Sequence, residues 1–415
     1  MNVTVKNGAR RGSVTAPASK SEAHRALICA ALSKRECRIV CGGISKDIAA
    51  TADCLGALGA GISVNGDVFA VRPISGESGN AILGCRESGS TLRFLLPVVG
   101  ALGREAVFRT EGRLAERPID GMISCLGAHG MKIEKKDGDF VCSGSLAPGE
   151  YSIPGDVSSQ YISGLLFALP LLPGDSTLTV TGRIESRDYI AMTEKAIASA
   201  GIEFEKKDGV YRIRGGQSYR FPETHTVGRD WSGAAFFLCI GAASADGVTV
   251  KGLSEDSAQG DRAILDVLRS AGAAVESSPA GITVSGGRLG GFTVDASAIP
   301  DLVPALSAAA ATARGVTVIR NAGRLRYKES DRLKTTRAML SSLGADVEET
   351  ADGLIIKGKE KLSGGTADSF NDHRIAMSAA VAASACGSPV TVTGAECVEK
   401  SYPGFWNDLN SLEVI

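Results

Sequence analysis

The chain has 415 residues and a formal net charge of −1, so charge alone gives no reason to expect a nucleic-acid or acidic membrane partner. Aromatic residues make up only 5% of the chain, too few to suggest base-stacking platforms, and the length is typical of two or three domains. The first residues contain no apolar signal core, and no apolar run is long enough to span a bilayer, so we expect a cytoplasmic protein without a membrane partner.

Six segments in chain order each begin with a polar cluster and continue into an apolar helix rich in Ala, Gly and Ser. Their starting positions are 69 to 71 residues apart, and a near-constant period over a whole chain predicts repeated architecture. Small residues on every side of these helices predict burial all round. The segments begin at Ser19, Ser88, Ser158, Arg229, Pro300 and Asn371.

A second, amphipathic helix follows 30 to 40 residues into each repeat, and five of these helices end at a glycine that suits a C-cap. Alternating strands come next, as in 202–213 around Asp208-Gly209, a typical hairpin turn. The repeat is thus roughly β-α-β-α-β-β. The capping glycines are Gly59, Gly130, Gly201, Gly272 and Gly344.

The two ends of the chain complement each other. The sixth repeat ends with the helix 404–412 and leaves almost nothing for a hairpin, while residues 1–17 supply alternating strands with no helix before them. We therefore expect the N-terminal strands to close the sixth repeat. Three repeats per domain then give one domain of residues 1–17 plus 229–415 and a second of 18–228, joined by two chain crossings that could act as hinges.

Polar residues gather where the helices begin. Free N–H groups and the positive end of the helix dipole favour anions there. Ser158, Asp230, Asp301 and Asp372 suit plain N-caps, a role that needs no ligand. The bases Lys20, Arg25, Arg93 and Arg374 neither cap a helix nor suit its dipole, which indicates bound anions.

The stretch RYKESDRL (326–333) places Lys328, Glu329, Asp331 and Arg332 at the start of the amphipathic helix that ends at Gly344. Basic residues at this end oppose the dipole, which favours an anion docked among them. A solvated, salt-bridged helix start is the alternative interpretation.

Metal and nucleotide motifs are missing from the sequence. Ten Cys and four His occur without zinc-type spacing, and GxxxxGK[ST] and a GxGxxG after a strand are both absent. Cys29, Cys239 and Cys386 lie in Ala-rich apolar runs, which predicts buried free thiols. We therefore expect no metal and no ATP or nicotinamide cofactor.

Nine stretches, in this order, resemble the 5-enolpyruvylshikimate-3-phosphate synthase family over essentially the full chain. They read PASKSEAHRA, ESGSTLRF, LAERPI, SSQY, ESRDYI, IPDL, RYKESDRL, NDHRIAM and EKSYPGFW. The resemblance implies an inside-out α/β fold of two domains, each with three repeats around buried central helices. It also implies a cofactor-free transferase, expected to be monomeric, that moves the enolpyruvyl group of phosphoenolpyruvate to the 5-hydroxyl of shikimate 3-phosphate.

The resemblance also implies roles for individual residues. Asp301 resembles the base toward the 5-hydroxyl, Glu329 the proton donor to the methylene carbon, and Lys20 a partner in proton transfer. Residues expected to bind shikimate 3-phosphate are Lys20, Ser21, Arg25, Ser158, Ser159, Gln160, Ser186, Asp301 and Lys328. Residues expected to bind phosphoenolpyruvate are Lys20, Gly89, Arg117, Gln160, Arg332, Arg374 and Lys400.

Three positions depart from the family pattern, because relatives often carry Asn where this chain has His24, Glu87 and Arg324. An alternative is a resemblance to UDP-N-acetylglucosamine enolpyruvyl transferase, a family that carries Lys-Asn at the first site and a Cys in the loop before its RPI motif. Here the first site reads Lys20-Ser21, and EGRLAERPI contains no Cys. A non-catalytic nucleic-acid binder built from similar repeats is a second alternative, which the neutral charge and scarce aromatics disfavour.

Overall fold

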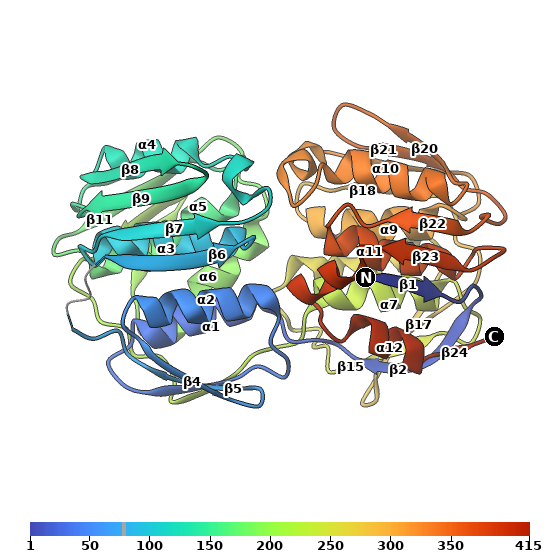
Figure 1. Ribbon diagram of the computed structural model, residues 1–415, viewed down its shortest axis with the longest axis horizontal. Coiled ribbons are helices and arrows are strands. Elements are labelled where there is room, and N and C mark those ends of the chain that lie inside the picture. Colours follow the sequence, from blue (N-terminus) through green and yellow to red (C-terminus); the bar gives the residue numbers. More distant parts are fainter. Residues whose placement is uncertain (77–79) are drawn as a thin grey trace. The chain divides into compact units, whose positions relative to one another are not determined.

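The chain divides into two units in the computed structural model, which describes residues 1–76 and 80–415 (Figure 1). The terminal unit comprises Met1–Ser19 and Gly228–Ile415, and the inserted unit comprises Lys20–Val227. The sequence-based division placed the boundaries after residues 17 and 228, whereas the units divide after Ser19 and Val227.

Residues 20–76 and 80–227 of the inserted unit contain three four-stranded sheets that share one strand order, with a parallel pair followed by an antiparallel hairpin. The sheets are β14 (Thr224–Thr226), β3 (Cys37–Val40), β5 (Val68–Arg72), β4 (Gly61–Asn65); β6 (Ala81–Arg86), β7 (Ala106–Thr110), β9 (Asp139–Gly144), β8 (Met131–Lys136); and β10 (Glu150–Pro154), β11 (Ser176–Thr181), β13 (Val210–Ile213), β12 (Phe204–Lys207). The helices are α1 (Lys20–Ala31), α2 (Lys46–Ala57), α3 (Gly89–Ala101), α4 (Asp120–Gly127), α5 (Ser159–Ala168) and α6 (Arg187–Ser199), with 3-10 turns η1 (Leu114–Glu116) and η2 (Leu169–Leu171).

Residues 1–19 and 228–415 of the terminal unit, all of them described, form sheets of five, four and three strands. These are β16 (Ala274–Ser278), β17 (Gly281–Ser285), β15 (Val248–Lys251), β2 (Arg10–Thr15), β24 (Glu413–Val414); β18 (Thr293–Asp295), β19 (Val316–Arg320), β21 (Leu354–Lys357), β20 (Asp346–Glu349); and β1 (Asn2–Val5), β23 (Val390–Thr393), β22 (Gly365–Asp368). The helices are α7 (Trp231–Ala242), α8 (Ile264–Ser270), α9 (Val303–Ala310), α10 (Arg332–Ser342), α11 (His373–Ala383) and α12 (Phe405–Ser411). The 3-10 turns are η3 (Gly260–Ala263), η4 (Pro300–Leu302), η5 (Gly323–Tyr327) and η6 (Ala395–Lys400).

The glycine turns predicted for the repeats are confirmed. The five glycines expected to end the amphipathic helices all have positive φ, between 76° and 103°, a conformation that a Cβ would strain. Asp208 and Gly209 both have positive φ, as the tight turn between β12 and β13 requires.

The pairing of the first two strands differs from the expectation that both would close the sixth repeat. Strand β1 does so, since it pairs with β23. Strand β2 instead lies parallel to β15 in the fourth repeat, and β24 pairs with its other edge. In the inserted unit β14 has the matching role, because it lies parallel to β3 of the first repeat. A parallel pair needs only a distant partner strand in register, so periodicity alone cannot say which strand supplies it.

The two segments that connect the units lie side by side within the terminal unit. Ala18 and Arg229 form an antiparallel bridge, Ser19 N donates to Gly228 O at 2.7 Å, and Asp230 N donates to Pro17 O at 2.9 Å. These backbone hydrogen bonds join positions about 210 residues apart in sequence, so both crossings are fixed by one short ladder.

The helices with small side chains lie in the interior, with the sheets around them, as the sequence predicted (Figure 1). Every residue of α11 is buried, and α7 is buried from Ala234 onward.

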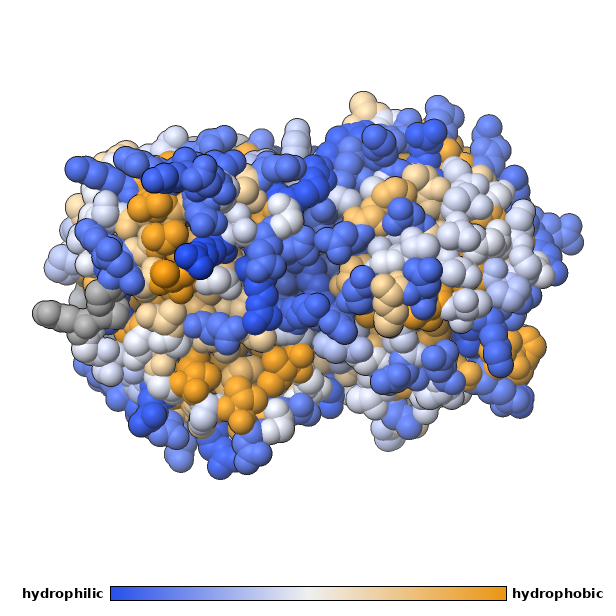
Figure 2. Space-filling view, in the orientation of Figure 1, coloured by the Kyte–Doolittle hydropathy of each residue, from blue (hydrophilic) through white to orange (hydrophobic). Residues whose placement is uncertain are grey.

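All the cysteines are free, and each is buried except Cys397, which is partly exposed. No described helix is long and apolar enough to cross a membrane. Val64, Ile82 and Val141 are exposed, and Figure 2 shows apolar side chains among the hydrophilic ones over the sheets of the inserted unit.

A substitution in β1 tests the closure of the sixth repeat. Val5 is 2% exposed and pairs with Val390, whereas Thr4, next to it, faces solvent. Val5→Asp should destabilise the terminal unit by about 3 to 5 kcal/mol, because it buries an unpaired carboxylate. Thermal unfolding measures the loss, and amide exchange should rise in β23. Thr4→Asp is the matched control and should change stability little; equal losses in the two variants would contradict the pairing.

Candidate functional site

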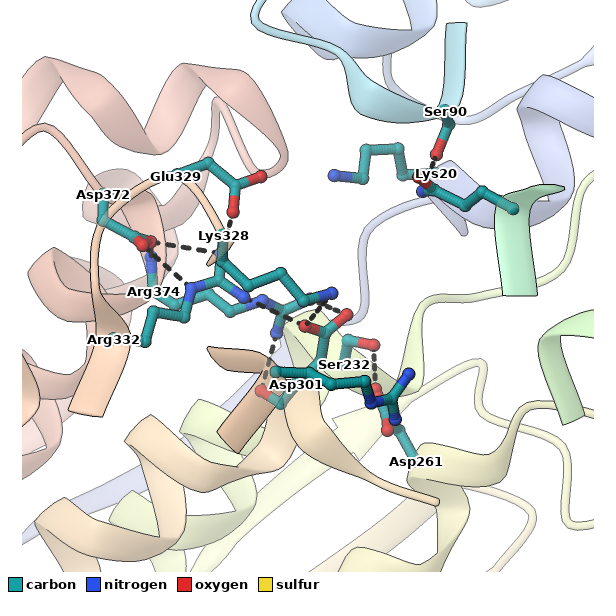
Figure 3. Close-up of polar contacts among 12 residues, drawn as sticks. Lys20, Ser90, Ser232, Asp261, Asp301, Lys328, Glu329, Arg332, Asp372 and Arg374 are labelled. Carbon is teal, nitrogen blue, oxygen red and sulfur yellow. Dashed lines mark hydrogen bonds and ion pairs between the residues drawn. The ribbon is translucent and has the colours of Figure 1, made fainter. Parts of the chain in front are cut away.

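Arg332 is the centre of the polar cluster in the terminal unit (Figure 3). It is the first residue of α10 and 1% exposed. Its Nε donates to Asp372 at 2.8 Å, its Nη1 to Asp301 at 3.0 Å and its Nη2 to Glu329 at 2.6 Å. Burial alone would lower the pKa of Arg332, but the surrounding carboxylates, Asp372 foremost, raise it above its usual range. The guanidinium therefore remains charged in the interior.

Asp301 is surrounded by cations. Besides Arg332, it contacts Arg374 Nη2 at 3.1 Å and Lys328 Nζ at 3.7 Å. Burial alone would raise the pKa of Asp301, but these cations, Arg374 foremost, hold it well below the ordinary value. Asp301 is therefore a carboxylate at neutral pH and is able to accept a proton. Asp301 lies within η4, whose N-cap is Ile299, and the N-cap of α9 is Leu302, so the alternative reading of Asp301 as an N-cap is wrong.

Asp372 has two roles in the cluster. As the sequence suggested, it is the N-cap of α11, and its carboxylate accepts from Arg374 N at 3.0 Å. The same carboxylate also accepts from Arg332, which joins the starts of α10 and α11. Lys328 and Glu329 come before α10 rather than within it, because Asp331 is the N-cap and accepts from Lys334 N. Lys400 is buried at the end of η6, which packs against α11.

Asp261 is a buried carboxyl group that sequence reasoning missed. It lies in η3 and is hydrogen bonded to Ser232 Oγ, while its Oδ1 has no hydrogen-bond partner among the described residues (Figure 3). Burial, and then the charge of Asp301, raise the pKa of Asp261 to about 7. No motif distinguishes this Asp in the sequence, since its environment comes from α7 and η4.

The start of α1 carries two of the predicted cations in the inserted unit. Lys20 Nζ lies 3.0 Å from Asp47 of α2. Arg25 is 3% exposed; its Nε donates to Thr193 Oγ1 at 2.8 Å and its Nη2 to Tyr189 O at 2.7 Å. Burial lowers the pKa of Arg25 to about 10, so it is still a cation at neutral pH. Ser21 lies one turn before Arg25, and its carbonyl oxygen accepts from Nη1 at 2.6 Å.

The start of α3 brings Gly89, Arg117 and Gln160 together through Arg93. A Cβ on Gly89 would lie 2.6 Å from Arg93 Nη1 and 3.0 Å from Arg117 Nη1, so the backbone of the helix start lies directly against two guanidinium groups. Arg93 Nη1 donates to Gln160 Oε1 at 3.0 Å, and Gln160 Nε2 donates to Ser90 Oγ at 2.9 Å. This is the arrangement expected of an anion site at a helix N-terminus.

The other three predicted serines lie at helix starts of the inserted unit. Ser158 is the N-cap of α5 and accepts from Gln160 N at 3.3 Å; Ser159 follows and is buried. Ser186 precedes α6 with φ of 51° and makes no capping hydrogen bond with its side chain. A non-Gly residue in this conformation is uncommon, and such residues are frequent at functional sites.

The predicted residues thus form two groups, one in each unit. The terminal unit holds Asp301, Lys328, Glu329, Arg332, Arg374 and Lys400, and the inserted unit holds Lys20, Ser21, Arg25, Gly89, Arg117, Ser158, Ser159, Gln160 and Ser186. Both groups present cations at helix starts, which suits ligands with several phosphate or carboxylate groups. Among the described residues no cluster of His, Cys, Asp and Glu could hold a metal ion.

Comparison with known proteins shows the family to which the chain belongs. The family model for EPSP synthase (3-phosphoshikimate 1-carboxyvinyltransferase) matches residues 5–409. The chain belongs to the EPSP synthase family. Relatives named 3-phosphoshikimate 1-carboxyvinyltransferase from Clostridium kluyveri and Clostridium acetobutylicum are each 42% identical over 410 and 412 residues, covering 97% of this chain and 95% of the relative.

Solved structures agree with this membership. An EPSP synthase from Acinetobacter baumannii has a TM-score of 0.81 at 26% identity and covers 100% of this chain and 99% of its own. The enolpyruvyl transferase NikO from Streptomyces tendae has a TM-score of 0.80 at 19% identity, which bears on the fold alone. The α/β fold class and the transferase class expected from the sequence are confirmed.

The raised pKa of Asp261 predicts a pH dependence of stability. Between its ordinary pKa of 3.8 and about 7, the folded protein holds a proton that the unfolded chain has lost. The free energy of unfolding of the terminal unit should therefore fall as pH rises through this window, by on the order of a few kcal/mol. Asp261→Asn keeps an acceptor for Ser232 and should remove this decline in denaturant unfolding measured from pH 4 to 8. Asp266→Asn, at a side chain that is 82% exposed, is the control and should keep the decline. An unchanged decline in Asp261→Asn would contradict the assignment.

Proposed function

We propose that the protein transfers the enolpyruvyl group of phosphoenolpyruvate to the 5-hydroxyl of shikimate 3-phosphate, with release of phosphate, in the biosynthesis of chorismate and aromatic amino acids. The observation that carries this proposal is the match of the family over residues 5–409, joined by relatives at 42% identity that are named for this reaction. The UDP-N-acetylglucosamine alternative is not favoured, because these relatives are named for the shikimate acceptor.

The charge of the substrates supports the proposal. Two phosphate groups and two carboxylates bring about five to six negative charges at neutral pH. In the inserted unit, we propose that shikimate 3-phosphate is held by Ser21, Arg25, Ser158, Ser159, Gln160 and Ser186, with Lys20 touching both substrates. Gly89, Arg117, Gln160, Arg332, Arg374 and Lys400 are proposed to hold phosphoenolpyruvate, while Lys328 orients shikimate 3-phosphate and Asp301 contacts it.

Asp301 is proposed as the base. Its three cationic neighbours lower its pKa in the protein described here, which makes it a weak base. Anionic groups of phosphoenolpyruvate that bind Arg332 and Arg374 would compete with Asp301 for these guanidinium groups. The pKa of Asp301 would then rise as the substrates bind, so its basicity would increase when the 5-hydroxyl is in place.

Glu329 is proposed as the acid. The 5-hydroxyl oxygen attacks C2 of phosphoenolpyruvate and its proton passes to Asp301, while Glu329 gives a proton to the methylene carbon. The product of this addition is a tetrahedral phospho-ketal. In the elimination step Glu329 takes back a proton from the new methyl group while the bond between C2 and the bridging oxygen breaks. Lys20 gives a proton to that oxygen as phosphate leaves, and Lys20 regains a proton when Asp301 releases the one it took from the 5-hydroxyl. Arg332 Nη2, at 2.6 Å from Glu329, orients this carboxyl group.

The assay of the function needs only the purified chain. Phosphate should be released when both shikimate 3-phosphate and phosphoenolpyruvate are present, and neither substrate alone should give it. We also propose that the chain acts as a cytoplasmic monomer without a cofactor or nucleic acid, so it should sediment as a single chain in the same buffer. Release with UDP-N-acetylglucosamine in place of shikimate 3-phosphate would overturn the acceptor assignment.

Glu329→Gln separates charge from catalysis. The amide oxygen can still accept from Arg332, but the side chain can no longer carry a proton, so turnover should fall by about 10² to 10⁴ while both substrates still bind. The control is Glu349→Gln, since Glu349 also pairs with a guanidinium, Arg326 at 2.6 Å, outside the proposed site. Steady-state kinetics of the two variants decides. Wild-type turnover in Glu329→Gln would leave Glu329 as a charge that only balances Arg332.

A further inference from the structure

Side-chain hydrogen bonds link helices α1, α2, α3, α5 and α6 of the inserted unit pairwise, and we call this set of links the circuit. His24 of α1 contacts Thr51 of α2 at 2.6 Å, and Thr51 contacts Thr91 of α3 at 2.7 Å. From α3 the circuit continues through Ser90 and Gln160 to α5. It returns through Thr193 of α6, which donates to Ser163 at 2.7 Å and accepts from Arg25 of α1 at 2.8 Å.

The part of the circuit from His24 to Ser88 is fully buried, since His24, Thr51 and Thr91 are each 0% exposed and Ser88 is 1% exposed. Its hydrogens can be assigned. Thr91 Oγ1 donates to Ser88 Oγ at 2.7 Å, which uses its single hydrogen. Thr51 must therefore donate to Thr91, and His24 must donate to Thr51 from a protonated Nδ1. The hydrogen bonds all run in one direction, from α1 to the cap of α3.

This series of hydrogen bonds ends at the start of α3. Ser88 is the N-cap and also accepts from Thr91 N at 3.3 Å, so Thr91 holds Ser88 Oγ from two atoms. Gly89 comes next. A Cβ on Gly89 would lie 2.6 Å from Arg93 Nη1 and 3.0 Å from Arg117 Nη1, so there is no room for one between the backbone and the two guanidinium groups. A shift of a few tenths of an ångström at Ser88 would therefore change how the free N–H groups of α3 face an anion.

Buried hydroxyl groups contribute little net stability and are costly when one partner is lost. Valine side chains of the same shape could fill the space of Thr51 and Thr91. The hydrogen-bonded hydroxyl groups at these positions are therefore better explained by the positioning of Ser88 than by a contribution to stability.

We propose that His24, Thr51 and Thr91 are positioning residues that act through Ser88 to fix the Gly89 turn against Arg93 and Arg117, and so determine the affinity for phosphoenolpyruvate. This inference rests on the proposed function, in which Gly89 and Arg117 hold that substrate. The residues of α1 and α6 proposed to hold shikimate 3-phosphate are fixed separately, by the hydrogen bonds of Arg25 to Thr193 and Tyr189. Substitution of these positioning residues should therefore weaken the binding of phosphoenolpyruvate and leave the binding of shikimate 3-phosphate nearly unchanged.

The test is Thr91→Val, with Thr91→Ser as the conservative variant that retains the hydroxyl group. Thr91→Val should raise the KM for phosphoenolpyruvate roughly five- to tenfold, the value of about one hydrogen bond. The KM for shikimate 3-phosphate should change less than about twofold, and Thr91→Ser should restore most of the loss. Thr51→Val should give the same pattern and serves if Thr91→Val does not fold.

The control is Thr317→Val, which removes another fully buried hydroxyl, one that accepts from Phe292 N at 3.3 Å in the terminal unit. It should lower the melting temperature without changing either KM. A double-mutant cycle of Thr91→Val with Ser88→Ala should be strongly non-additive in the KM for phosphoenolpyruvate, since both act on one turn.

Unchanged KM values in Thr91→Val and Thr51→Val, with a loss of stability like that of Thr317→Val, would overturn the inference. Equal increases in both KM values would also overturn it, because the circuit would then support the whole unit. Absence of phosphate release in the wild-type protein would instead contradict the proposed function, so the two failures are distinguishable.

Discussion

Burial of the central helices on all sides is the constraint on which the rest of the structure depends. A helix such as α11 has no solvent-facing stripe, so its polar residues can lie only at its ends or in pairs with neighbours. The N-terminal ends also offer free N–H groups and a favourable dipole for anions. Packing of several such helices therefore gathers caps, cations and carboxylates at their starts, and the proposed site follows from the way the cores are filled.

The cluster around Arg332 shows how buried cations are countered by the protein's own carboxylates. Arg332 and Arg374 are countered by Asp301, Asp372 and Glu329 at 2.6 to 3.1 Å, so the buried cations are paired. The protein's own carboxylates thus occupy positions that substrate anions would compete for. This competition links binding to the basicity of Asp301, which couples affinity and proposed catalysis through the same guanidinium groups.

The polar contacts of the inserted unit are of another kind. Lys20 is paired with Asp47, but other contacts there involve neutral groups: Thr193 and a carbonyl oxygen hold Arg25, and the hydroxyl groups from His24 onward lead to Ser88. The hydrogen bonds of Arg25 described above go to neutral groups and burial lowers its pKa, whereas the carboxylates around Arg332 raise the pKa of that residue. We expect Arg25 to attract an anion without the release of a hydrogen-bonded carboxylate, whereas an anion at Arg332 must compete with Asp301, Asp372 and Glu329.

The sequence by itself determined the period of about 70 residues, the buried helices and the turn at each capping glycine, because these depend on local chemistry repeated along the chain. The full-length resemblance predicted the residues of both groups, and their roles remain a proposal. Only the tertiary structure decided that β2 joins the fourth repeat and β14 the first, since any strand of matching pattern could fill either place. It likewise decided that Asp301 pairs with cations rather than caps a helix, and that Asp261 is a buried acid. The charges that act on these carboxylates come from residues 27 to 113 positions away, and a local sequence pattern contains no information about such neighbours.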